Sequence, residues 1–268
     1  MKITKLSTQK YTSFKSKKKN IRLADDIVRK TKHEFPAHSP SYIDSYWLSL
    51  KNPKHSNKER NVKILTNNLG TRLFAYRINC GFKKDTLQRP LGLLETTKEF
   101  KIANCIEFAQ LTEATMLANG YRDTNLAEVK IKLTLFDKKS KKKIYECFEP
   151  FDHIVVLSKL DDKNSKNPII LDAWIGKAMS FSKAKEEYLG MLSEEEIEKI
   201  VKNGLASYNL AHALNLDDND TIDLNGIDYS IQIVFDELES SFLKRKFEQN
   251  PDIISENLHA KFPDLVLK

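Results

Sequence analysis

Residues 127–136 read Ala-Glu-Val-Lys-Ile-Lys-Leu-Thr-Leu-Phe. Apolar and polar residues alternate along this stretch, which places Val129, Ile131, Leu133 and Leu135 on one side. A period of two is typical of a β-strand with one buried face. We therefore expect a strand here, and the elements on either side of it decide the fold class.

The sequence after this strand predicts more strands and then helices. We expect the chain to return in a strand at 143–148, followed by a strand rich in β-branched residues at 151–159 and by further strands at 169–174 and 226–235. Short polar links make these strands antiparallel neighbours. Helices are expected at 180–189, from the capping box at Ser193 towards 214 with a break at Gly204, and at 238–249, where Pro251 ends the helix.

The sequence before the strand predicts helices. Residues 105–119 are rich in good helix formers and apolar on most sides, so we expect a buried helix that ends at Gly120 in a left-handed cap. Weaker patterns indicate helices at 21–32 and 42–50, and helical or mixed structure at 61–78. The expected fold is α+β, with a core helix packed on an antiparallel sheet and flanking helices.

Composition excludes several classes of protein. The eight glycines are at least eleven residues apart, so neither a dinucleotide-binding G-x-G nor a P-loop is present. The three cysteines form no C-x-x-C pair, and the six histidines show no spacing typical of zinc ligands. No apolar run is long enough to span a membrane, and the N-terminus does not resemble a secretory signal. We expect no metal and no cofactor.

The positive charge is concentrated at the N-terminus. Residues 1–32 hold eleven Lys or Arg and two Asp, whereas the whole chain has a net charge of +7, so the remainder is slightly acidic. We expect a flexible basic leader over 1–19, a single domain over 20–268, and no nucleic-acid partner. The lysine cluster at 138–143 is interpreted as a hairpin end kept soluble by its charge.

Three residues fall in an order that suits thiol chemistry. Cys105 begins the core helix, His153 lies on a strand, and Asp172 lies on the next strand. A helix N-terminus favours a thiolate, a histidine can hold the proton, and a carboxylate can orient the imidazole. Each residue also has an ordinary structural interpretation, because buried Cys, strand His and strand-end Asp are common in cores.

The segments around these residues carry a resemblance. Asn-Cys-Ile-Glu-Phe-Ala at 104–109, Asp-His-Ile-Val-Val at 152–156 and Leu-Asp-Ala-Trp-Ile-Gly at 171–176 resemble motifs of papain-like and transglutaminase-like cysteine enzymes. These include bacterial effectors of the YopT protease and Gln deamidase types. The resemblance covers about residues 104–182. It departs from the family pattern at Ala173, where Pro is usual, and at Asn104, where Gly is frequent.

The resemblance implies a papain/transglutaminase-like fold and assigns roles to residues. Cys105 would be the nucleophile, His153 the general base and acid, and Asp172 the orienting carboxylate. Asn104 and Glu99 are candidates for a second oxyanion donor, and Trp174 would shield the Cys–His pair or simply pack in the core. The implied activity is acyl transfer on an amide bond of a protein substrate, by proteolysis, deamidation or transglutamination.

Two other functions stay open. One is a catalytically inactive relative that binds a host protein through the same fold. The other is a binder of nucleic acid or a membrane surface through the basic arm, with the three residues together by accident. The resemblance to effectors implies delivery into a host cell by a route other than the general secretory one; otherwise we expect a cytoplasmic protein. The oligomeric state is left open.

Overall fold

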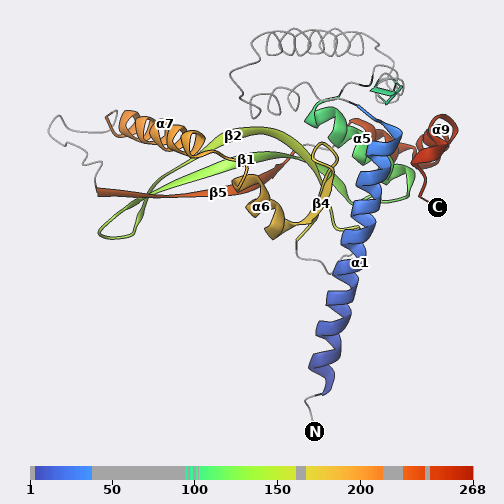
Figure 1. Cartoon of the computed structure of the whole chain (residues 1–268), viewed down its shortest axis with the longest axis horizontal. Helices are drawn as coiled ribbons and strands as arrows, with labels where there is room; N and C mark the ends of the chain where they lie inside the picture. The colour runs from blue at the N-terminus through green and yellow to red at the C-terminus, as the bar shows by residue number, and fades with distance from the viewer. Residues whose placement is uncertain are drawn as a thin grey trace, which may run out of the picture. The chain divides into compact units, whose positions relative to one another are not determined.

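The computed structural model describes residues 4–37, 94–95, 97–98, 101, 103–160, 167–213, 226–238 and 242–267. Figure 1 shows helices at both ends of the chain and strands between them. The helices are α1 (Thr4–Glu34), α5 (Cys105–Ala118), α6 (Phe181–Leu189), α7 (Glu194–Ala213), α8 (Phe242–Gln249) and α9 (Pro251–Lys261), followed by a 3-10 turn (Pro263–Leu265). The strands are β1 (Thr124–Asp137), β2 (Lys143–Ser158), β3 (Ile169–Asp172), β4 (Lys177–Ser180) and β5 (Ile227–Glu237).

The strands form one sheet in the order β4-β3-β2-β1-β5. β1 pairs antiparallel with β5 over eleven residue pairs, from Ala127↔Glu237 to Asp137↔Ile227. β2 pairs antiparallel with β3, and β3 with β4. The expected α+β class, with an antiparallel sheet and flanking helices, is therefore confirmed.

The chain divides into two compact units. The first comprises Met1–Leu126, Ile154–Ser180 and Leu238–Lys268, and the second comprises Ala127–His153 and Phe181–Glu237. β2 runs from the second unit into the first between His153 and Ile154. That residues 20–268 fold as a single domain stays a prediction.

Helix α5 is the centre of the first unit. Eleven of its fourteen residues are buried, as the apolar residues around its circumference predict. The helix ends as expected at Gly120, which has a φ of +81°. The Gly120 N–H donates to the carbonyl of Leu117 at 3.0 Å and the Tyr121 N–H to that of Met116 at 3.0 Å, which is a Schellman motif.

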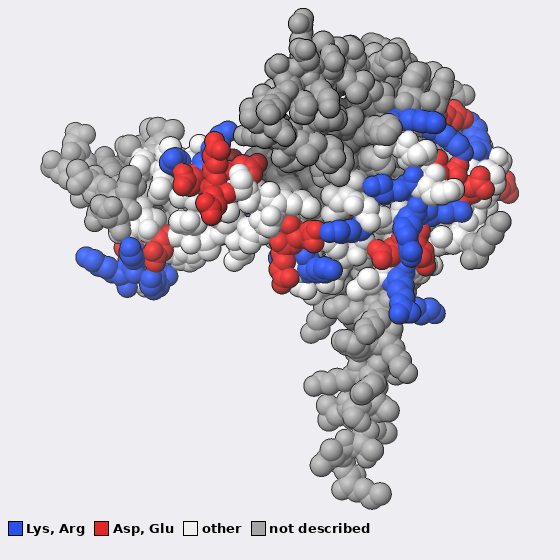
Figure 2. Space-filling model, in the orientation of Figure 1, with Lys and Arg blue, Asp and Glu red and all other residues white. Residues whose placement is uncertain are grey.

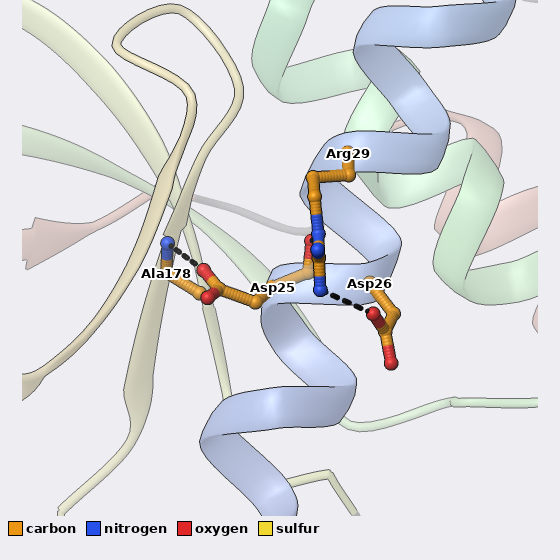
Figure 3. Close-up of polar contacts among 4 residues, drawn as sticks. All are labelled: Asp25, Asp26, Arg29 and Ala178. Atoms are coloured by element: carbon orange, nitrogen blue, oxygen red, sulfur yellow. Dashed lines mark hydrogen bonds and ion pairs between the residues drawn. The ribbon is translucent and has the colours of Figure 1, made fainter.

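Helix α1 packs beside α5 and the sheet in the first unit. The hydroxyl of Thr31 lies 3.0 Å from that of Thr115 on α5, and both threonines are fully buried. About one and a half turns earlier on α1, Asp25 Oδ1 accepts the backbone N–H of Ala178 on β4 at 3.0 Å (Figure 3). Asp25 therefore ties α1 to the last strand of the sheet.

Helices α6 and α7 pack on the sheet residues of the second unit. The ring of Phe181 lies 5.1 Å from that of Phe235 on β5, measured between centroids, and Tyr145 on β2 lies 5.7 Å from Tyr208 on α7. Alternate residues of β1, including the fully buried Leu133, face these helices. The alternation that predicted β1 thus corresponds to a helix-covered face.

Several boundaries differ from those expected. α1 begins at Thr4 rather than near residue 21, because no Gly or Pro interrupts this part of the chain, so it includes most of the stretch assigned to a leader. The two strands expected at 143–148 and 151–159 are one strand, β2, with a local irregularity at Asp152, whose φ is +55°. The strand expected at 169–174 ends at Asp172, where the chain turns into β4.

The C-terminal half differs in two further ways. α7 begins after the Ser193 capping box, as expected, but runs through Gly204 without a break. α9 was not expected, and Pro251 begins this helix as well as following α8, because Pro is well tolerated in a first helical turn. The helix expected at 42–50, the structure expected at 61–78 and Cys80 lie outside the described residues.

Candidate functional site

Cys105 occupies the first position of α5 and is partly exposed. The preceding residue, Asn104, is the N-cap and has extended backbone angles, φ −101° and ψ −173°. The carboxylate of Glu107 accepts the Asn104 N–H at 2.9 Å, and the Phe108 N–H donates to the Asn104 carbonyl at 2.9 Å. Two hydrogen bonds therefore fix the backbone directly before Cys105.

Glu107 caps the N-terminus of α5. Glu107 is only 2% exposed, and its carboxylate accepts a hydrogen bond from the backbone N–H of Asn104. That N–H is therefore engaged, and the side chain of Asn104 forms the other half of a capping box with the backbone N–H of Glu107. That Asn104 contributes to an oxyanion site stays a prediction. Glu99, the other candidate donor, lies outside the described residues.

Asp172 ends β3 and organises the turn into β4. It is 2% exposed, and its Oδ1 accepts the backbone N–H of Trp174 at 3.0 Å and that of Ile175 at 3.2 Å. Its carbonyl accepts the N–H of Gly176 at 2.9 Å, and Gly176 adopts the positive φ of +78° that the turn requires. Asp172 is thus a turn-capping residue, whatever further role it has.

Trp174 lies within that turn and is half-buried. It packs against the hydrophobic core of the first unit, and its carbonyl lies 3.5 Å from the Nζ of Lys32 on α1. These contacts give Trp174 a packing role, which is one of the two roles expected for it. That it also shields a Cys–His pair stays a prediction.

His153 lies on β2 and belongs to the second unit. It is 5% exposed, and its ring lies 5.6 Å from that of Tyr188 on α6, measured between centroids. The preceding Asp152 is exposed, so it does not share the buried environment of His153.

The structure places two of the predicted site residues in the same unit. Cys105 and Asp172 belong to the same unit, where α5 contacts β3. The strand that carries His153 pairs with the strand that carries Asp172, as expected, through Val156↔Leu171 and its neighbours. The approach of His153 to Cys105 and Asp172 stays a prediction.

Cys147 has an environment different from that expected of a nucleophile. It lies on β2 and is partly exposed; burial raises the pKa of its thiol, and the nearby charge of Glu149 raises it further. A raised pKa favours the unreactive thiol at neutral pH. Cys147 is therefore an internal reference for the reactivity of Cys105: both thiols are partly exposed, and that of Cys147 has a raised pKa.

The described residues bring no three His, Cys, Asp or Glu side chains together as a metal site. Within the same residues, none of the helices has the length and apolar character needed to cross a membrane. Comparisons with protein-family models, with curated proteins and with solved structures each found no match to this chain.

Proposed function

We propose that the protein is a thiol-dependent acyl-transfer enzyme that acts on an amide bond of a protein substrate. The observation that carries the proposal is the setting of Cys105. It is a partly exposed thiol at the first position of a buried helix, on a backbone fixed by the Glu107–Asn104 hydrogen bond. A helix N-terminus stabilises negative charge through its dipole and its N–H groups.

The proposed reaction steps use the side chains of Cys105 and His153. His153 takes the proton of Cys105, and the thiolate attacks the amide carbonyl carbon to form a tetrahedral intermediate. That intermediate collapses to a thioester when the imidazolium of His153 protonates the leaving amine. Water or a second amine, deprotonated by His153, then attacks the thioester and releases Cys105.

The position of Asp172 is compatible with an orienting role. One of its carboxylate oxygens accepts the two turn N–H groups. A carboxylate has a second oxygen that can accept further hydrogen bonds, so holding the turn and orienting an imidazole do not exclude each other. β3, which carries Asp172, pairs with β2, which carries His153.

The three outcomes of the thioester are distinguished by the substrate and by access of water. Attack by water after cleavage of a backbone amide is proteolysis, and attack by water after loss of ammonia from Gln is deamidation. Attack by a Lys amine is transglutamination. The proposal covers the shared steps, in which Cys105, His153 and Asp172 have the same roles.

The test is site-resolved alkylation of the full chain. Native protein is treated with iodoacetamide at pH 6 for increasing times, and mass spectrometry follows Cys105, Cys80 and Cys147 separately. An activated Cys105 reacts fastest, and an ordinary thiol with a pKa of about 8.5 is under about 1% ionised at this pH. Cys147 reacts slowly, because burial raises the pKa of its thiol.

Two histidine variants make the test specific. His153→Ala slows the labelling of Cys105, because it removes the group that accepts the thiol proton. His33→Ala, which removes an exposed histidine of α1, leaves the labelling rate unchanged. Equal labelling of the three cysteines, unaffected by His153→Ala, would refute the enzyme and favour the inactive, protein-binding relative.

The wider proposal, an effector injected by a bacterium to act on a host protein, is supported by the sequence resemblance alone. A reporter enzyme fused to the C-terminus, with the N-terminal stretch intact, tests delivery into host cells. No signal from the host compartment would remove the delivery proposal and leave the chemistry of Cys105 to be judged by alkylation.

A further inference from the structure

The end of the β1–β2 hairpin presents an exposed cluster of lysines. We call residues 138–143 the hairpin tip; it contains Lys138, Lys139, Lys141, Lys142 and Lys143. Every residue of the hairpin tip is exposed. Figure 2 shows these basic side chains as a group beyond the strands of the second unit, with acidic side chains beside them.

The backbone of the hairpin tip is well defined by hydrogen bonds. The Lys141 N–H donates to the Asp137 carbonyl at 2.8 Å, and the Ser140 N–H donates to the Asp137 carboxylate at 2.5 Å. The Lys138 N–H donates to the carbonyl of Gly226, next to β5, at 2.7 Å. The lysines are therefore presented by a turn that is tied to both neighbouring strands.

Two of the five lysines form ion pairs with acidic neighbours. Lys141 Nζ lies 2.7 Å from Asp228, and Lys143 Nζ lies 3.3 Å from Glu146. Within the part of the chain that the structure describes, Lys138, Lys139 and Lys142 have no ion-pair partner. The charges of Lys138 and Lys139 nevertheless act on the carboxylates of Asp228 and Asp137. The five lysines outnumber these two carboxylates and that of Glu146, and the surplus of positive charge attracts an anionic partner.

Exposed apolar side chains lie at the same end of the sheet. Ile144, directly after the hairpin tip, is 36% exposed. Tyr229 is 53% exposed and pairs with Leu135, two positions before the end of β1. An apolar side chain beside lysines suits a lipid interface, where headgroups meet the ammonium groups and the apolar side chains enter the acyl boundary.

We propose that the hairpin tip is a contact site for an anionic lipid bilayer. Lys138, Lys139 and Lys142 contact the headgroups, while Ile144 and Tyr229 enter the interface. Lysine attracts phosphate and carboxylate headgroups as a point charge, and the hairpin tip contains no Arg, the residue that best recognises nucleic-acid phosphates and bases bidentately. This inference does not depend on the chemistry of Cys105.

The experiment measures binding of the full chain to vesicles by flotation. One set contains equal parts of phosphatidylserine and phosphatidylcholine, and the other contains phosphatidylcholine alone. We expect binding to the anionic set only, reduced by salt. The triple variant Lys138→Gln, Lys139→Gln, Lys142→Gln weakens binding about a hundredfold, from about 1 kcal/mol for each lysine near an anionic surface.

A control variant with the same net charge as the triple hairpin-tip variant distinguishes binding through the hairpin tip from binding through the N-terminal lysines. Lys17→Gln, Lys18→Gln, Lys19→Gln removes three positive charges from α1 and should weaken binding much less than the hairpin-tip variant. Equal losses in the two triple variants would contradict the proposal, because binding would then follow total charge.

The apolar contribution has its own test. Ile144→Ser weakens vesicle binding, and its far-UV circular dichroism spectrum matches that of the wild type, because Ile144 is 36% exposed and lies at the end of the hairpin. If neither Ile144→Ser nor the hairpin-tip variant affects vesicle binding, the proposal is wrong. It is also wrong if the hairpin-tip variant binds vesicles normally but loses affinity for a single-stranded oligonucleotide, which would assign the lysines to nucleic acid.

Discussion

Asp172 allows stability and catalysis to be separated by two substitutions. Asp172→Ala removes the acceptor of the Trp174 and Ile175 N–H groups, whereas Asp172→Asn keeps a carbonyl oxygen in its place. A hydrogen bond to a charged group contributes about 1.5–3 kcal/mol. The two bonds therefore set an upper range of about 3–6 kcal/mol for the loss in Asp172→Ala.

The expected loss is smaller than that upper range. Trp174 and Ile175 are half-buried, so water can reach part of the turn once the carboxylate is gone. We expect Asp172→Ala to lower the free energy of unfolding by about 2–3 kcal/mol. Asp172→Asn should lower it by about 1 kcal/mol, because a neutral acceptor forms weaker hydrogen bonds than a charged one.

The assay is urea unfolding followed by far-UV circular dichroism, combined with the alkylation rate of Cys105. If Asp172 orients His153, then Asp172→Asn slows Cys105 labelling, though by less than His153→Ala does, while the protein stays folded. An Asp172→Ala protein as stable as the wild type would refute the turn-capping argument. A stable Asp172→Asn protein with unchanged Cys105 labelling would refute the orienting role.

Three further predictions concern packing, the edge of the sheet and a thiol. Gly204→Ala should lower the free energy of unfolding, measured in urea, by about 1 kcal/mol. The new Cβ would lie 2.1 Å from Leu133 Cδ2. Overpacking of this kind costs about 1–3 kcal/mol, which is more than the gain of about 1 kcal/mol from the higher helix propensity of Ala. Adding Leu133→Ala should cost less in this background than in the wild type, and equal costs would show that Leu133 moves aside freely. Asp25→Ala should lower the melting temperature more than Asp25→Asn, because only Ala loses the acceptor for the Ala178 N–H; equal melting temperatures would contradict this. Native Cys147 should reach half-maximal alkylation at a higher pH than the same residue in urea, because burial raises the pKa of the folded thiol; coincident pH profiles would contradict it.

The elements that local pattern predicted well are those whose pattern is strong. β1 alternates apolar and polar residues from Ala127 to Leu135, and α5 has apolar residues on most sides and a glycine at the position of its left-handed cap. α7 was expected to break at Gly204, since glycine is a poor helix former. In the structure α7 continues through Gly204, where the absence of a side chain lets the helix pack closely against Leu133 of β1. This is a long-range contact that no local pattern reveals.

The candidate site was predictable only where local pattern determines it. The sequence placed Cys105 at a helix start and Asp172 on a strand, and both positions are confirmed. It did not indicate that Asp172 caps a turn, because the predicted strand extended past it to residue 174. Nor did it identify Asp25, whose partner lies more than 150 residues away in sequence. Contacts of this kind depend on the tertiary arrangement.

The contact between Asp25 and β4 has a consequence for self-association. β4 is an outermost strand of the sheet, and unpaired N–H groups on an outermost strand can template the addition of a strand from another molecule. The carboxylate of Asp25 occupies one of these donors and places negative charge beside the strand (Figure 3). Conditions that detach α1 would therefore expose a surface competent for intermolecular β-pairing.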